Sequence, residues 1–562
     1  MARIDSQILF LTTSPRTPSK MIPEISLLIE NFKGEIWNKD SQKKFMELLR
    51  DEQFFNGLGA NDPSFSARDR INRAPKSLGF VKLYPKIELT SAGEALVSAK
   101  NPEEIFLRQF LKFQIPSPYH IPSAKATDFW IKPYLEMLRL VRVMGTLRFD
   151  ELQIFGMQLT NWRDFENIVE KIKRFRNEKT QNSLSKRLSY QEFKSQYLIR
   201  ELKEIFFLRI SKGETKTREN SDRSLENFLK TQAHNMRDYA DACFRYLRAT
   251  GLVNVSHVGK SLSIIPERVA DVDYILKNVE RDPCFVDDLH QYEMYLGNSS
   301  IPELLTDNRE NVIHRLNDEF PDVCIDLNSP TEKLKLMLIE QSEKRKQNTI
   351  SQQVLDIKDY KQYDDIQNTF NQIILGNLYD MPLMLEWNMW RAMTMLDGGI
   401  IKANLNFDDF GNPLSTAAGN MPDIICDYDD YILSVEVTMS SGQRQYDMEG
   451  ESVSRHLGKL KCMSNKPAYG LFIAPKINEA TIAHFFVLHH TNISFYGGKS
   501  IIVPLPLAVF QKMLEDSFSA DYIPNPVHVR NFFEFSMKIA QSGVDEITWY
   551  EMMKDKAVNW LQ

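Results

Sequence analysis

The sequence predicts a multidomain α/β protein with a mainly helical front half and a rear domain built on a mixed β-sheet flanked by helices. Three observations lead to this prediction. The 562 residues, 43% of them hydrophobic, suffice for several domains that each bury a core. A helix followed by two short strands occurs twice in the front half. Over roughly the last 200 residues, helices alternate with apolar strands.

The first helix-and-strands pattern lies before residue 130. A helical stretch at residues 65–71 precedes short strands at residues 78–83 and 86–90. Another helix then starts, with Thr90 or Ser91 as its capping residue. This order of helix, two-stranded wing and helix is the pattern of a winged-helix subdomain, in which a helix enters the major groove of DNA.

Three arginines on that first helix are candidates for DNA contact. Arg68, Arg70 and Arg73 are placed to read base edges or to clamp phosphates. The alternative for each is a solvated arginine on an exposed helix face.

A similar pattern recurs after residue 130. A helix through residues 236–248 ends near Gly251, and strand-like runs follow at residues 252–255 and 262–265. This arrangement predicts a second winged-helix subdomain.

These patterns divide the chain into four parts. Residues 1–130 and 131–275 form two DNA-recognition subdomains, and residues 276–360 form a polar helical connector. Residues 361–562 form the rear, catalytic domain.

The net charge of −6 conceals an asymmetry between the halves. Residues 1–275 carry 44 Lys and Arg against 34 Asp and Glu, whereas residues 276–562 carry 25 against 41. A basic half favours binding of a polyanion, and an acidic half favours a metal site that concentrates cations. A chance imbalance between solvated faces is the alternative.

Several classes of protein are excluded by composition. No run of about eighteen apolar residues exists, and the first residues lack the features of a secretion signal, so we expect a soluble intracellular protein with no membrane association. The five cysteines are scattered without a C-x-x-C pair, which speaks against disulfides and zinc and for buried thiols.

Two carboxylates in the rear domain predict a metal site. Asp423 and Glu436 lie thirteen positions apart, and the segment between them reads as a β-hairpin that turns on acidic residues. Because alternate residues of a strand share a face, Glu436 points with Ser434 and Thr438, and Val435 packs on the other face. Carboxylates on neighbouring strands can hold Mg²⁺ against a phosphate that is to be cleaved.

Three further side chains extend this constellation. Glu449 and His456 lie seven residues apart on the following helix, so they share a face that can point back at the sheet. Glu386, on the preceding helix, could bind the metal directly or through water. The short sequences around the first two carboxylates, Pro-Asp at Asp423 and Glu-Val-Thr at Glu436, are weak evidence by themselves, because such short patterns occur often by chance.

The chain resembles the AlwI-type restriction endonucleases, a group that includes the BstNBI-like nicking enzymes, over most of its length. The matching blocks are Ser14-Pro15-Arg16-Thr17-Pro18, residues 65–70, residues 237–242 with Arg245-Tyr246, residues 417–423, residues 436–438, residues 449–456 and residues 471–475. Arg16, Arg237 and Arg245 in these blocks join the candidates for DNA binding.

The resemblance implies a rear domain of the PD-(D/E)xK nuclease type and a front half that selects a short asymmetric DNA site. Such enzymes hydrolyse DNA a few base pairs to one side of the site with Mg²⁺, in the cytoplasm of a prokaryotic cell. It also implies catalytic roles for Asp423, Glu436, Glu449 and His456, and metal binding by Asp423, Glu436 and Glu386. Thr438 stands where the broad pattern has lysine, which leaves either His456 or Glu449 to replace it.

The resulting function is that of a type IIS restriction endonuclease acting on double-stranded DNA. Because each catalytic domain holds one active site, cutting both strands requires a transient homodimer or a separate small catalytic subunit, met through the C-terminal domain. A strand-specific nicking enzyme, or the large subunit of a heterodimeric enzyme, is the alternative within the class. A non-catalytic winged-helix regulator is the alternative from another class, and an RNA-directed nuclease is disfavoured because nothing resembles an RNA-recognition sheet.

Overall fold

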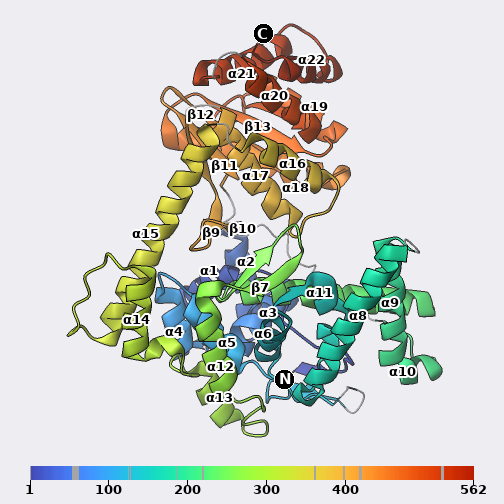
Figure 1. Ribbon diagram of the computed structural model, residues 1–562. Coiled ribbons are helices and arrows are strands. Elements are labelled where there is room, and N and C mark those ends of the chain that lie inside the picture. The colour runs from blue at the N-terminus through green and yellow to red at the C-terminus, as the bar shows by residue number, and fades with distance from the viewer. Residues whose placement is uncertain are drawn as a thin grey trace. The chain divides into compact units, whose positions relative to one another are not determined.

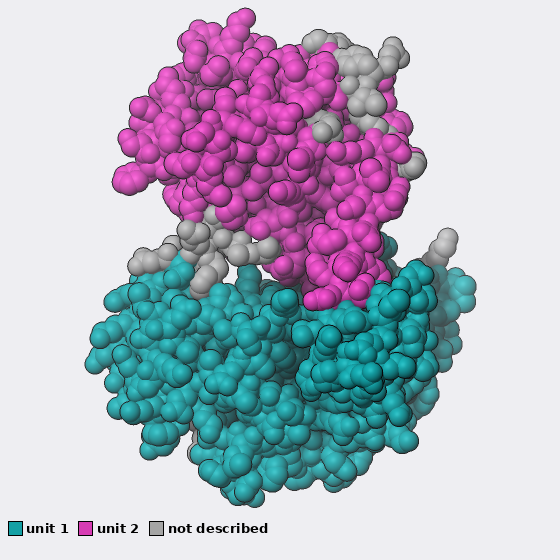
Figure 2. Space-filling view, turned by 90° about the vertical axis from the view of Figure 1, so that its left-hand side faces the viewer, with its two compact units in different colours: residues 1–52, 57–339 teal, residues 53–56, 340–562 magenta. Residues whose placement is uncertain are grey.

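The computed structural model divides the chain into two compact units (Figure 2). One comprises residues 1–52 and 57–339, and the other residues 53–56 and 340–562. The structure describes residues 2–52, 62–123, 126, 128–185, 188–217, 221–359, 362–396, 399–416, 421–520 and 524–561. The boundary falls inside helix α15 (Thr331–Lys358), so residues 276–339 of the predicted connector belong to the first unit. The four-part division remains a prediction.

The first unit is mainly helical (Figure 1). Its helices are α1 (Met21–Phe32), α2 (Lys39–Asp51), α3 (Pro63–Ser77), α4 (Ser91–Ser98), α5 (Glu103–Lys112), α6 (Pro133–Met144), α7 (Phe149–Ile154), α8 (Phe165–Ser185), α9 (Tyr190–Ile205), α10 (Phe207–Ser211), α11 (Leu225–Arg248), α12 (Val269–Asn278), α13 (Leu289–Gly297) and α14 (Arg309–Glu319). Its strands are β1 (Ala2–Ile4), β2 (Val81–Lys82), β3 (Glu88–Leu89), β4 (His120–Pro122), β5 (Thr146–Arg148), β6 (Val253–Ser256) and β7 (Ser261–Ile264).

The first predicted helix–wing–helix segment is present as α3, the antiparallel pair β2–β3, and α4. The Thr90 hydroxyl accepts a hydrogen bond from the Gly93 amide at 3.0 Å and thus caps α4, as its sequence position indicates. Gly93 packs so closely on the wing that a Cβ there would lie 2.0 Å from the Phe80 carbonyl. Helix and wing are therefore held together by a contact that only glycine permits.

The second helix-and-strands segment is α11 followed by the antiparallel pair β6–β7, to which β5 adds a third strand. Gly251 ends the helical region with a φ of +67°, and a Cβ there would lie 2.5 Å from a carboxylate oxygen of Glu103. This left-handed conformation explains why the chain turns sharply from helix to strand at a glycine.

The second unit alternates helices and strands (Figure 1). Its helices after α15 are α16 (Tyr363–Ile374), α17 (Met381–Leu396), α18 (Gln443–Ser464), α19 (Glu479–His490), α20 (Leu507–Ser519), α21 (Pro526–Ala540) and α22 (Glu546–Val558). Its strands are β8 (Ile400–Ala403), β9 (Leu405–Phe407), β10 (Pro413–Thr416), β11 (Ile424–Tyr428), β12 (Tyr431–Val437), β13 (Ala468–Ala474) and β14 (Ile501–Pro506).

A five-stranded mixed sheet organises this unit, in the order β14-β13-β12-β11-β8. Strands β12, β13 and β14 are parallel, whereas β11 runs antiparallel to both β12 and β8. The hairpin joining β11 to β12 turns at Asp429 and Asp430, because Tyr428 pairs with Tyr431. The mixed sheet flanked by helices that the sequence predicts is confirmed.

The two faces of the sheet pack against different helices. Val435 and Leu471 belong to a large core that includes residues of α16, α17 and α20 to α22. Phe472 and Ile502 belong to a smaller core shared with α18 and α19. Because α18 follows β12 directly and covers this second face, its inward side chains meet those of β12.

Two general properties concern the helices and the cysteines. No helix within the described part of the chain is both long enough and apolar enough to span a bilayer. The expectation of buried thiols is wrong for Cys324 and Cys462, which are exposed, while Cys243 and Cys426 are buried and all five cysteines are free.

Candidate active site

Strand β12 presents Glu436 toward α18. Val435 packs in the larger core, so its neighbour Glu436 points to the opposite face of the sheet. Glu436 is only 6% exposed, although it carries an ionisable group. A carboxyl group so buried needs specific partners, and α18 and β11 supply them.

Asp423 is tied to the end of β12 through the backbone. It immediately precedes β11, and its carboxylate accepts a hydrogen bond from the Val437 amide at 2.8 Å. The backbone of Asp423 in turn forms a hydrogen bond with the Glu436 carboxyl group. The hairpin register thus places the two acidic side chains together, as the sequence predicts.

His456 reaches the same cluster from α18. Its Nδ1 lies 2.7 Å from Oε1 of Glu436, and His456 is 8% exposed. Its position on the second turn after Glu449 lets both side chains face the sheet.

Glu449 lies beside Thr438, the residue that follows the end of β12. The Thr438 hydroxyl forms a hydrogen bond with the Glu449 carboxyl group and accepts another from the Ser440 amide at 3.0 Å. Glu449 and Asp423 both keep part of their surface exposed, unlike Glu436 and His456. The cluster therefore has a buried side and a side that solvent can reach.

Burial and mutual repulsion shift the protonation of these groups. Burial and the neighbouring charge of Glu436 raise the pKa of Asp423 well above its usual range, against the opposing effect of the Val437 amide. Burial and the charge of Glu449 likewise raise the pKa of Glu436. Burial raises the pKa of Glu449, and burial with the nearby Arg455 lowers the pKa of His456 to about 4. Three acidic groups with raised pKa values and a neutral imidazole favour a bound cation.

The donor set fits Mg²⁺ in its usual protein environment. Among the residues that the structure describes, no three His, Cys, Asp or Glu side chains form a ready-made metal cage. Mg²⁺ seldom uses one, because it keeps several waters and binds one or two carboxylates together with substrate phosphate oxygens. Asp423 and Glu436 offer such hard oxygen donors.

Glu386 approaches the sheet from a different element. It lies half-buried on α17, a helix that packs on β8, β11 and β12. Residues of α17 belong to the larger core, on the face of the sheet opposite to Glu436. Metal binding by Glu386, directly or through water, remains a prediction.

Gln445 was not predicted as a site residue, yet it organises the start of α18. This fully buried side chain donates hydrogen bonds to the carbonyls of Ser440 and Lys476, both at 2.9 Å, and accepts one from the Asn478 amide at 2.8 Å. It joins the segments that follow β12 and β13, one turn before Glu449. A single glutamine carries no sequence signal for this role, because its partners are backbone groups far along the chain.

The arginines predicted to contact DNA differ in their surroundings. Arg70 forms an ion pair with Glu24 of α1, a carboxylate that is 4% exposed on its side chain. Arg245 pairs with Asp241 one turn earlier on α11, with 3.0 Å between Nε and Oδ2. The first pair joins α3 to α1, whereas the second lies within α11.

The other candidate arginines are more exposed. Arg16 lies 3.3 Å from Asp238, and Arg73 pairs with Asp69 on its own helix. The Arg68 guanidinium lies 5.7 Å from the centroid of the Phe65 ring. Arg237 is exposed on α11. All six remain predictions as DNA-binding residues. Of the block at residues 417–423 that matched the family, positions 417–420 lie outside the described residues.

Comparison with known proteins identifies the family. The model of the AlwI restriction endonuclease family matches residues 76–513. No curated protein matches. Among solved structures, the chain is similar to the small subunit (R.BspD6I2) of the heterodimeric restriction endonuclease R.BspD6I, with 23% identity, a TM-score of 0.28, and coverage of 35% of this chain and 95% of that one.

The restriction endonuclease FokI bound to DNA is also similar, with 11% identity, a TM-score of 0.22, and coverage of 92% of this chain and 96% of that one. Because both TM-scores are low, these two structures contribute nothing to the assignment of the family. The family match spans more than half of the chain and includes the whole acidic cluster. The chain therefore belongs to the AlwI restriction endonuclease family and is a type II site-specific deoxyribonuclease.

Proposed function

We propose that this chain is a type IIS restriction endonuclease that binds a short asymmetric site and hydrolyses DNA a few base pairs outside it with Mg²⁺. The observation that carries the proposal is the convergence of Asp423, Glu436, Glu449 and His456 at one end of β12. The cluster lies in one unit, whereas the two helix-and-wing segments lie in the other. Cleavage outside the recognised site requires that one part of the chain binds the site while another part cuts the DNA.

Asp423 and Glu436 are the proposed metal ligands, with Glu386 as a further contributor. When bound, Mg²⁺ neutralises charge on the scissile phosphate and makes water a stronger acid. The chain's contribution is to hold two carboxylates at fixed positions, through the Val437 amide and through His456. Such preorganisation means that the ligands need little rearrangement during the reaction.

Glu449 is the proposed base that takes the proton from the attacking water. It keeps solvent contact, and burial raises its pKa toward the range in which a carboxylate accepts a proton effectively. His456 is less suited, because its Nδ1 is already engaged with Glu436. Thr438 occupies the position where the broad nuclease pattern has lysine. Its hydrogen bond to Glu449 orients this base, and Thr438 does not itself act as a base.

One catalytic cluster per chain sets a further requirement. Cleaving both strands needs two clusters, so we propose that the C-terminal unit meets a second copy of itself or a small catalytic subunit. A chain that acts alone would nick one strand.

Incubation of supercoiled plasmid with the purified protein and Mg²⁺ tests the proposal. Linear product with fixed ends supports cleavage of both strands, and open circles alone support nicking. Asp423→Asn and Glu436→Gln should each abolish cleavage while binding in Ca²⁺ persists, because each removes a ligand charge and keeps the shape of the side chain. Unchanged cleavage by both variants would remove these residues from the mechanism.

A further inference from the structure

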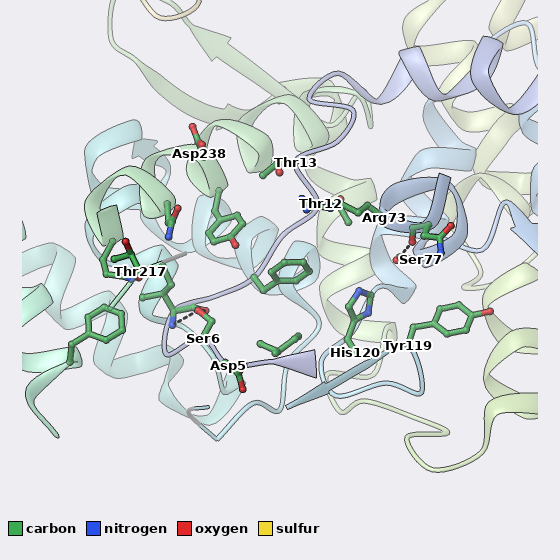
Figure 3. A pocket seen from close by; sticks show the side chains of 18 of the residues that line it. Asp5, Ser6, Thr12, Thr13, Arg73, Ser77, Tyr119, His120, Thr217 and Asp238 are labelled. Carbon is green, nitrogen blue, oxygen red and sulfur yellow. Dashed lines mark hydrogen bonds between the residues drawn. The ribbon is translucent and has the colours of Figure 1, made fainter. Parts of the chain in front are cut away.

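A large cavity lies within the first unit, away from the acidic cluster. Its volume is about 830 Å³, and all of its lining residues belong to the first unit. Figure 3 shows the N-terminal segment, with Asp5, Ser6, Thr12 and Thr13, running between Asp238 on one side and Ser77 on the other. The walls come from α11, from the end of α3 and from the chain before α1, together with Tyr119, His120 and residues between 206 and 217.

These two helices hold equivalent places in the predicted subdomains. Helix α3 precedes the wing β2–β3, and α11 precedes the strands β6–β7. In a winged-helix unit, the helix before the wing is the one that enters the major groove. Both predicted reading helices therefore face one shared space.

Lys76 is a cation that faces this cavity. Its Nζ lies 4.5 Å from the centroid of the Tyr119 ring, and the side chain is half-buried. Within the described residues it forms no hydrogen bond and no direct ion pair, and burial lowers its pKa below the usual lysine value against the opposing charge of Glu293. A partly desolvated ammonium group gains most from an anion of high charge density, such as a phosphate oxygen.

Gln232 and Asn235 are amides that face the same cavity from α11. They lie three positions apart, so they share one face of the helix with Asp238 on the next turn. Neither side chain makes a hydrogen bond to any residue in the described part of the structure. Amide side chains match the N6 and N7 groups of adenine in the major groove with two hydrogen bonds.

We propose that this cavity receives the edge of the DNA duplex, with Lys76 holding a backbone phosphate and Gln232 and Asn235 reading an adenine. The inference rests on the proposed function and deepens it, because it names where the recognition unit meets its substrate. It assigns base reading to amides on α11, whereas the arginines Arg70 and Arg245 are held by carboxylates.

Selection from a library of randomised duplexes in Ca²⁺ tests the reading residues without cleavage. The wild-type protein should enrich one sequence that contains an essential A·T pair. In Asn235→Ala, the preference for that pair should fall about 5- to 150-fold, which is the effect expected from losing one base contact made by two hydrogen bonds. Gln291→Ala, an exposed amide on α13 outside the cavity, is the matched control and should keep the preference. An unchanged preference in both Asn235→Ala and Gln232→Ala would overturn the assignment.

Salt titration of the affinity for the selected duplex tests Lys76. Lys76→Met should make the slope of log affinity against log salt shallower by about 0.9, which corresponds to one phosphate contact. Lys277→Met, an exposed lysine on α12, is the control and should keep the slope. Lys76→Arg retains the charge and should also keep it. A wild-type slope in a folded Lys76→Met protein would overturn the phosphate contact.

Failure of the inference differs from failure of the proposed function. If the wild-type protein selects a site and cuts beside it, but the cavity variants bind as it does, only the inference fails. If the wild-type protein binds a site and never cuts it, the cavity assignment can still hold while the nuclease proposal fails.

Discussion

The imidazole Nδ1 of His456 lies 2.7 Å from Oε1 of Glu436, joining helix α18 to strand β12 in a buried pair. The two residues are twenty positions apart in sequence and belong to different elements. This contact orients Glu436 together with the hydrogen bond between its carboxyl group and the Asp423 backbone.

Removal of this contact should weaken metal binding more than folding. For His456→Ala, the Mg²⁺ concentration for half-maximal cleavage should rise about 10- to 100-fold, the usual effect of losing a residue that orients a metal ligand. Cleavage rates measured across a Mg²⁺ titration give this value. His484→Ala, on the neighbouring helix α19, is a control that should leave it unchanged. A His456→Ala protein with a wild-type Mg²⁺ dependence would contradict an orienting role.

The hydroxyl group of Thr438 should be required for full activity. Thr438→Val keeps the shape but removes the hydrogen bonds to Glu449 and from the Ser440 amide, at a cost to the free energy of unfolding of about 1–3 kcal/mol. Because Glu449 loses its anchor, single-turnover cleavage should slow at saturating Mg²⁺. Thr438→Ser retains the hydroxyl and should stay close to wild type. Wild-type cleavage by Thr438→Val would contradict a role for the hydroxyl group.

A paired substitution separates structural and DNA-binding roles of Arg70. Arg70→Ala leaves the buried Glu24 carboxylate without its ion pair, so it should lower the free energy of unfolding by about 2 kcal/mol or more. Replacing both residues, as Arg70→Leu with Glu24→Leu, should recover most of that loss. Denaturant unfolding measures stability, and binding to the selected duplex measures function. If the stable double variant still binds weakly, Arg70 also contacts DNA.

The second unit should lose stability in mild acid through His489. Its Nδ1 lies 2.9 Å from the Phe485 carbonyl and its Nε2 lies 3.2 Å from the Ser536 hydroxyl, and burial lowers its pKa from 6.5 to about 4. As pH falls, the unfolded chain therefore binds a proton before the folded one does. The stabilisation is fully present above pH 6.5 and is lost progressively toward pH 4, on the order of 3 kcal/mol.

Urea unfolding followed by tryptophan fluorescence measures this dependence. Trp549, one of the seven tryptophans, has its ring centroid 5.0 Å from that of His489. The difference between wild type and His489→Gln isolates one residue, because other titrating groups contribute equally to both. Parallel stability curves between pH 4 and 6.5 would contradict the prediction.

Some elements of the rear unit, such as the hairpin of β11 and β12, could be predicted because their signals are local. The alternation of Val435 and Glu436 along one apolar strand, and the acidic turn before it, indicate a β-hairpin without knowledge of any distant residue. The same holds for the helix–wing segments, where Thr90 and Gly251 mark element ends by their own conformational preferences.

The sequence by itself determined the two helix-and-strand segments, the acidic hairpin with the helix and strand that follow it, the family of the chain, and which acidic residues meet in the hairpin, since strand register follows from a two-residue turn. Only the tertiary structure decided that His456 engages Glu436, that Gln445 joins two loops, and that Lys76 and Asn235 face one cavity. The physical reason is range: local propensity and strand alternation act over a few residues, whereas these contacts join segments that come together only when separate elements bury their apolar faces.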